Sequence, residues 1–299
     1  MIPNCRKPLA FSHTPEALRL YPPRSGDTGH MPLYRDQGVV LRCHKLGEAD
    51  RIVTVLTRDY GLVRAVAKGV RRTTSGFGAR LEPLGHIDVQ FHTGRSLDVV
   101  TQVETISAFG SVLAGDYGSW TAGQAMAEAA EKVVGEQGEP ARQQYWLLVA
   151  GLRALVQAEH EHGLILDAFL LRSLSVAGWA PSFDACVRCG EPGPHRAFHI
   201  GAGGALCRSC RIPGSAAPSP SAFELMSALL TGDWDAADAA EARTQRETSG
   251  LVAAYSQWHL ERKLRSLPLV ERERPGPVDV PSAPPAVAVW GDATDTPSP

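Results

Sequence analysis

The chain has 299 residues, of which 43% are hydrophobic and 21% charged, and its formal net charge at pH 7 is −2. This composition is typical of a globular protein with room for two compact domains, and it excludes a uniformly basic coat for nucleic acid. The sequence has no run of about 18 apolar residues and does not begin with a basic stretch and an apolar segment, so we expect no membrane span, no secretion and a cytoplasmic location.

Residues 1–30 are predicted to be a disordered extension. They contain prolines at positions 3, 8, 15, 22 and 23 and show no sustained periodicity. The first patterned stretch begins at Met31, which we interpret as a natural start unless residues 1–30 form a disordered arm.

Residues 31–110 are predicted to form a small β-domain. In one run, Ile87, Val89 and Phe91 alternate with polar residues and so share one face of a strand. Five short strands in this length suit a closed barrel, of which the OB-fold is the common five-stranded example, although an SH3-like barrel fits the pattern almost as well. The five runs rich in Val, Ile and Thr are 38–43, 51–57, 62–68, 86–92 and 97–106.

The β-domain carries a basic stretch that is a candidate nucleic-acid-binding surface. No Asp or Glu occurs between Asp59 and Glu82, and segment 68–80 is polar and contains glycines, so we expect a mobile loop between two strands. A cationic loop with an aromatic residue can follow a phosphate backbone and stack on a base. The alternative is an ordinary solvated loop. The candidate residues are Arg64, Lys68, Arg71, Arg72, Phe77 and Arg80.

Residues 111–270 are predicted to form a helical domain. Segment 164–179 is apolar nearly all round, which places it in the middle of a bundle, and Gly178 and Pro181 are expected to end it. Residues 31–110 hold 11 basic and 8 acidic residues, whereas residues 111–180 hold 4 and 8, so the β-domain is the better candidate for binding a polyanion. Further helices are predicted near 119–133, 148–156, 223–230 and 249–267.

Two CxxC pairs inside the helical domain are the strongest motif in the sequence. Cys186 and Cys189 are separated by 17 residues from Cys207 and Cys210. Two tight turns supply the four soft ligands of a tetrahedral Zn²⁺, and four thiolates leave no position for water, so we predict one structural zinc ion per chain in a knuckle over residues 184–212. The alternatives are a redox dithiol and a pair of disulfides. The arginines of the knuckle offset the charge of the thiolates, so we do not predict that it binds DNA.

The predicted last helix carries Arg262, Lys263 and Arg265 on or beside its exposed face. These cations complement the dipole at a helix C-terminus. Alternatively, they surround an apolar groove that holds an acidic peptide. The proline-rich residues 271–299 are predicted to be a disordered tail.

The sequence lacks the common catalytic motifs. It contains no GxxxxGK[ST], no GxGxxG after a strand, no HExxH and no GxSxG. A zinc hydrolase or deaminase would need an open metal position, and the deaminase signature is absent. We therefore predict that the protein is not an enzyme.

These features, in this order, resemble the RecO family of bacterial recombination mediators. The match covers about residues 31–268, and the stretch from Gly47 to Arg72 is its most specific part. The matching segments are YRDQGVVL (34–41), LGEADRIV (46–53), TRDYG (57–61), AVAKGVRR (65–72), RSLSVAGWAP (172–181), the cysteine pairs and HLERKLRS (259–266).

The resemblance implies an N-terminal OB-fold followed by a helical domain with an inserted zinc knuckle. It also implies binding of single- and double-stranded DNA, annealing of complementary strands and a nucleoid-associated location. The implied protein partners are the acidic tail of single-strand-binding protein, RecR and, indirectly, the recombinase RecA.

Residues are carried over from the family only where the motifs match. Lys68, Arg71 and Arg72 become candidates for DNA contacts, and Arg262, Lys263 and Arg265 become weaker candidates for partner contacts. Some relatives lack the cysteines, so the knuckle is best interpreted as stabilising the helical domain. The competing hypothesis is a zinc-stabilised protein-interaction scaffold that does not bind DNA.

Overall fold

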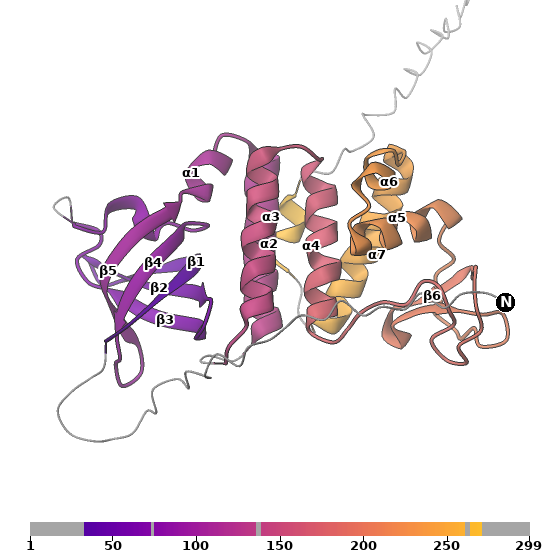
Figure 1. The fold of residues 1–299 in the computed structure, drawn as a ribbon, viewed down its shortest axis with the longest axis horizontal. Helices are drawn as coiled ribbons and strands as arrows, with labels where there is room; N and C mark the ends of the chain where they lie inside the picture. The colour runs from indigo at the N-terminus through magenta and orange to yellow at the C-terminus, as the bar shows by residue number, and fades with distance from the viewer. Residues whose placement is uncertain (1–32, 73–74, 136–138, 261–263, 271–299) are drawn as a thin grey trace, which may run out of the picture.

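The computed structural model describes residues 33–72, 75–135, 139–260 and 264–270. The predicted extension at 1–30 and the predicted tail at 271–299 lie outside the described residues. The described chain is elongated, with a β-barrel at one end, helices in the middle and a small β-hairpin insertion at the other end (Figure 1).

The N-terminal part is a closed five-stranded barrel. The strand order is β1-β2-β3-β5-β4, and β4 closes the barrel against β1. The pairs are antiparallel except β3 with β5, which is parallel. This is the arrangement of an OB-fold, so the predicted fold is confirmed and the SH3-like alternative is wrong. The strands are β1 (Leu33–Leu46), β2 (Asp50–Thr57), β3 (Gly61–Ala67), β4 (His86–His92) and β5 (Asp98–Ser107).

Alternation along β4 shows how the sequence fills the barrel. Ile87, Val89 and Phe91 are fully buried inside it, as the pattern predicts. His86 points to the opposite face, yet it is also buried, because that face packs on the helices. Its Nε2 lies 2.8 Å from the hydroxyl of Tyr145. One strand therefore serves both the barrel interior and the contact with the helical part.

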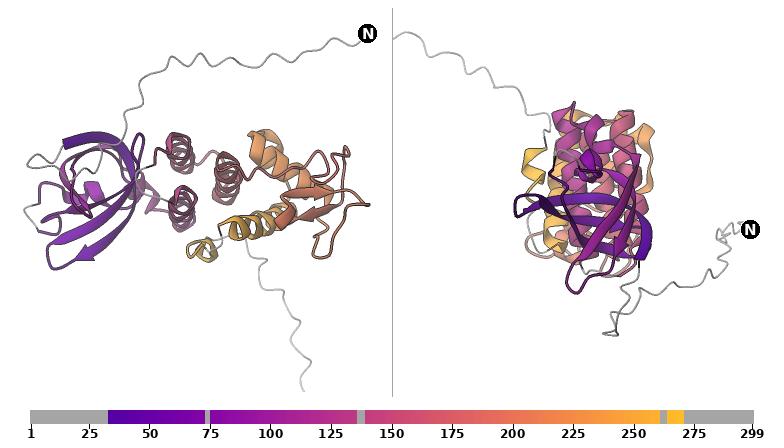
Figure 2. Two further views of the ribbon diagram at one scale, coloured as in Figure 1. Left: turned by 90° about the horizontal axis from the view of Figure 1, so that it is seen from below. Right: turned by 90° about the vertical axis from the view of Figure 1, so that its left-hand side faces the viewer.

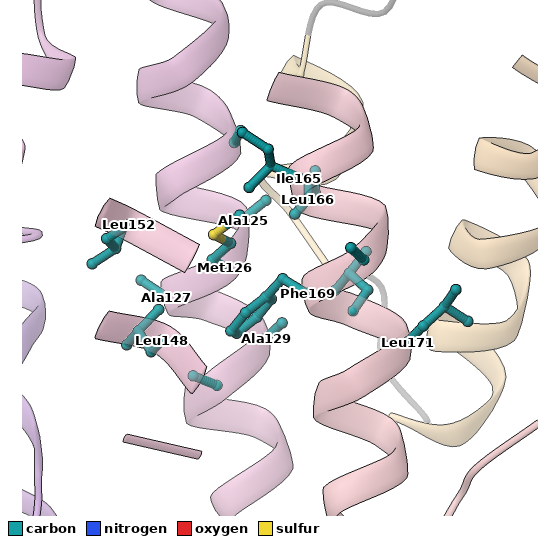
Figure 3. Close-up of a cluster of buried hydrophobic side chains, with 14 of the residues drawn as sticks. Ala125, Met126, Ala127, Ala129, Leu148, Leu152, Ile165, Leu166, Phe169 and Leu171 are labelled. Carbon is teal, nitrogen blue, oxygen red and sulfur yellow. The ribbon is translucent and has the colours of Figure 1, made fainter. Parts of the chain in front are cut away.

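The helical part is built around α4. Eleven of the 15 residues of α4 are buried, because neighbouring helices surround it, and this confirms its predicted central place. Phe169 points toward α2, whereas Leu171 points to the opposite side (Figure 3). Within the described residues, no helix combines the length and the apolarity needed to cross a membrane. The helices are α1 (Phe109–Leu113), α2 (Tyr117–Val134), α3 (Arg142–Gln157), α4 (His162–Val176), α5 (Pro220–Thr231), α6 (Trp234–Asp238) and α7 (Ala242–His259).

The end of α4 follows the predicted stop signal. Gly178 has a φ of 90°, a left-handed conformation that favours glycine. Its amide donates to the carbonyl of Ser175 at 3.0 Å, and the amide of Trp179 donates to the carbonyl of Leu174 at 2.8 Å. This double hydrogen bond satisfies carbonyls that the helix leaves unpaired at its end.

The prediction for the last helix was wrong in its bounds. The helix α7 ends at His259 rather than near Leu267, and a 3₁₀ turn, η3 (Leu267–Leu269), follows later in the chain.

A carboxylate on a distant helix holds the chain that follows the end of α7. Glu128 of α2 accepts hydrogen bonds from the amides of Arg265 and Ser266, both at 2.9 Å. It also accepts one from the Ser266 hydroxyl at 2.5 Å. These bonds use amides that a continued helix would direct at its own carbonyls, so the chain is held across α2 instead.

The barrel and the helices share one hydrophobic core. Ion pairs border this contact: Arg42 Nη2 lies 2.5 Å from Glu131 Oε1, and Arg142 Nε lies 2.7 Å from Asp59 Oδ1. The core therefore fixes the barrel against α2 and α3. The barrel residues in the shared core are Val39, Leu41, Leu56, Leu62 and Leu84.

Candidate metal centre and nucleic-acid interface

The four cysteines belong to an insertion between α4 and α5, at the end of the molecule opposite the barrel (Figure 2). Its two short strands are β6 (Ala197–His199) and β7 (Gly204–Leu206). Local hydrogen bonds fold each CxxC turn: the Gly190 amide donates to the Cys186 carbonyl at 2.8 Å, and the Cys210 amide donates to the Cys207 carbonyl at 3.2 Å. These turns bring the sulfurs of both pairs to one place.

The geometry of the sulfurs fits a metal ion. All four Sγ atoms lie within 4.8 Å of one another, and those of Cys189 and Cys207 are 3.7 Å apart. Tetrahedral coordination at a metal–sulfur distance of about 2.3 Å requires sulfurs about 3.8 Å apart. All four are free thiols, and the sulfurs of both pairs converge on one place, as a four-ligand metal site requires and two separate disulfides would not. The cysteines can therefore hold one metal ion.

Charge at the cluster also favours a cation. The amides of Cys207, Cys189 and Arg188 donate toward the Cys186 sulfur and lower the pKa of this thiol to about 6. At Cys207, the neighbouring Glu191 carboxyl and burial raise the pKa to about 12. Sulfurs this close cannot all ionise unless a positive charge balances them, and a bound dication would supply that charge.

The predicted nucleic-acid-binding cations gather near the connection between β3 and β4. Arg64 lies on β3, Lys68 follows the strand, and Arg80 lies in the 3₁₀ turn η1 (Gly78–Leu81). Arg71 and Arg72 lie between Lys68 and Arg80 in the chain. The side chains of all five residues are exposed. The structure thus places four of the five on a single connection of the barrel.

These cations have no carboxylate partner among the described residues. The guanidinium of Arg71 donates to the Glu48 carbonyl at 2.8 Å, and that of Arg80 donates to the Gly76 carbonyl at 2.6 Å. Their charges are therefore free to attract an anion. In contrast, four other barrel arginines each pair with Asp or Glu; they are Arg35, Arg42, Arg51 and Arg58.

Phe77 does not stand free in solvent. Its side chain is half-buried and packs against the interior cluster of the barrel. It also lines a pocket of about 860 Å³ beside the loop. Any stacking by Phe77 would therefore take place inside this pocket.

The predicted partner-contact residues Arg262, Lys263 and Arg265 can be placed only in part. Arg262 and Lys263 lie outside the described residues. Arg265 is exposed, but its backbone is held by Glu128 and it does not continue a helix. Arg265 therefore does not lie on a helix face, contrary to the prediction from the sequence.

Two features of the site were missed by sequence reasoning. One is Glu128, an acidic residue of α2 that accepts a hydrogen bond from Ser266. No sequence pattern links these two positions. The other is the pocket, whose wall combines Phe77 and Pro83 with Trp120 of α2. No local pattern could reveal it, because these residues meet only once the barrel packs on the helices.

Comparison with known proteins gives matches along most of the chain. The family profile described as "Recombination protein O N terminal" matches residues 31–109, and "Recombination protein O C terminal" matches residues 114–268. The chain is 63% identical to "DNA repair protein RecO" of Thermobifida fusca over 242 residues, which cover 81% of this chain and 100% of that relative. It is 60% identical over 248 residues to the proteins of the same name from Streptomyces griseus and Streptomyces coelicolor, again covering 81% of this chain and 100% of each relative.

Proposed function

The chain belongs to the RecO family of DNA repair proteins, and on this basis we propose that it is a non-catalytic recombination mediator. It binds single- and double-stranded DNA and anneals complementary strands. With RecR, it assists the loading of RecA onto DNA that single-strand-binding protein covers. Its place of action is the nucleoid in the cytoplasm.

The observation that carries the proposal is the group of unpaired cations on an OB-type barrel. Lys68, Arg71, Arg72 and Arg80 share one connection, and no described carboxylate neutralises them. Barrels of this class bind single strands through cations that follow the backbone and aromatic residues that stack on bases. The proposal assigns DNA binding to residues 31–110 and protein contacts to residues 111–270.

The proposed metal is a structural Zn²⁺ held by Cys186, Cys189, Cys207 and Cys210. Four thiolates complete the shell of a zinc ion, so the ion would stabilise the insertion and leave no position for a reacting water. Purified protein prepared without chelator should contain about one zinc per chain. Metal analysis that finds none would refute this part of the proposal.

Binding of a single-stranded oligonucleotide across a salt series tests the DNA assignment. Each lost phosphate contact makes the slope of log affinity against log salt shallower by about 0.7. We expect this change for Arg72→Ala and about twice the change for Arg71→Ala/Arg72→Ala. The control is Arg35→Ala, which removes an exposed arginine whose charge is paired with Asp88 at 2.7 Å. Its slope should match that of the wild type.

The other outcomes are equally informative. Wild-type binding with unchanged loop variants would place the DNA site elsewhere on the protein. A wild type that binds no DNA at low salt would leave the alternative, a zinc-stabilised scaffold for protein contacts.

A further inference from the structure

A pocket of about 860 Å³ lies where the barrel meets α1 and the start of α2. Figure 1 shows α1 beside the barrel, leading into α2. Phe77 and Pro83 contribute to one wall, and Trp120 contributes from α2. Ala108 and Ala114, at the two ends of α1, also line it. The pocket therefore offers apolar and aromatic surfaces against which a flat ring can pack.

The rim of the pocket carries positive charge. Arg80 lines the pocket directly. Ser75 lines it too, and its amide donates to the Arg72 carbonyl at 3.0 Å, so the backbone of Arg72 lies close to the pocket, whereas its side chain runs near Gly69. The acidic residue in the lining, Glu82, is neutralised by Arg51 at 2.6 Å. A ligand that suits this site combines a flat apolar group with flanking anions.

We propose that the pocket accepts an unstacked base of single-stranded nucleic acid while Arg72 and Arg80 bind the neighbouring phosphates. This inference rests on the proposed function and goes further, because it assigns the base contacts and a reason to prefer single strands. A base in a duplex is already stacked and paired, so it cannot enter without opening the helix. A base in a single strand is free to enter and stack against an aromatic wall.

An acidic peptide with an aromatic side chain would use the same features. Nucleic acid is favoured because the cations continue beyond the pocket to Arg71 and Lys68 along the same connection, as a repeating phosphate backbone requires. The peptide is therefore treated as an outcome of the test.

The test compares two oligonucleotides of equal length: one of thymidines and one of abasic sugars, which keeps the phosphates but has no bases. The wild type should bind the thymidine strand about 10-fold more tightly, which is about 1.4 kcal/mol and lies within the range for stacking one base. Phe77→Leu should bring the two affinities together without weakening binding of the abasic strand.

Two further variants guard against misfolding and non-specific effects. Ser111→Leu places a larger side chain at an exposed position of the pocket lining, and it should reduce the preference for bases as Phe77→Leu does. Trp146→Leu removes an aromatic ring that is 51% exposed on α3, outside this pocket, and should leave the preference intact.

The outcomes separate this inference from the proposed function. A wild type that binds both strands equally, or a preference that survives Phe77→Leu and Ser111→Leu, overturns the pocket assignment but leaves DNA binding in place. A wild type that binds neither strand refutes the proposed function itself. If Phe77→Leu abolishes binding of an acidic peptide containing phenylalanine but leaves the preference for the thymidine strand unchanged, the pocket belongs to a peptide and the base assignment is overturned.

Discussion

Replacing Glu128 should release the chain segment that follows α7. Burial on its own would raise the pKa of this carboxyl, but hydrogen bonds from Ser266 and Arg265 outweigh it and lower the pKa to about 2, compared with 4.5 for an ordinary glutamate. At about 1.4 kcal/mol for each pKa unit, this difference corresponds to about 3 kcal/mol at neutral pH. The side chain is 21% exposed, so solvent screening reduces the effect and we expect Glu128→Gln to cost about 2 kcal/mol.

Urea unfolding of the wild type and Glu128→Gln measures this cost. Because the pKa of Glu128 is lower in the folded state than in the unfolded state, its contribution is complete above pH 4.5 and is lost as the pH falls toward 2. The two proteins should therefore differ most at pH 7 and converge in acid. Glu104→Gln, at a side chain that is 73% exposed, is the control and should cost less than about 0.5 kcal/mol. Equal stability of the wild type and Glu128→Gln at pH 7 would refute the reasoning.

Four further predictions concern other parts of the molecule. Cys207→Ser should abolish metal binding and lower the melting temperature, because Phe198 of β6 packs on Phe223 and Tyr255; hydrogen exchange should show the loss of protection in the insertion and α5 rather than in the barrel. Tyr145→Phe should cost about 1–2 kcal/mol in urea unfolding, since it removes the partner of His86 Nε2. Burial lowers the pKa of His86, so wild-type stability should also decline as the pH falls below 6.5, and His86→Gln should weaken that dependence. Leu166→Ala, at a fully buried position of α4, should cost about 2–5 kcal/mol, and a cost below about 1 kcal/mol would contradict the central place of this helix.

The parts of the fold that local patterns encode were predictable from the sequence. Ile87, Val89 and Phe91 alternate with polar residues, as expected for a barrel strand. The run of apolar residues in α4 predicts that this helix is buried at the centre of a bundle. The cluster of four cysteines was predictable for a similar reason, because the spacing of two CxxC turns matches the ligand geometry of a metal site. In each case the residues that decide the structure are close together in the chain.

The features that failed depend on contacts between distant residues. The end of α7 was placed too late because Glu128 lies more than 130 positions before the amides that it binds. Phe77 was expected to be available on a loop, but the barrel interior and the pocket hold it on two sides. No propensity or periodicity contains this information, since it arises only when the barrel and the helices are packed together.

The shared core also fixes the distance between the two ends of the molecule. The β3–β4 connection and the cysteine insertion lie on opposite sides of the helices (Figure 1). A hinge that brought them together would have to expose Leu41, Leu56 and Leu62, which are buried against the bundle. The two ends therefore keep a constant separation, and a partner that contacts both of them must span that length itself.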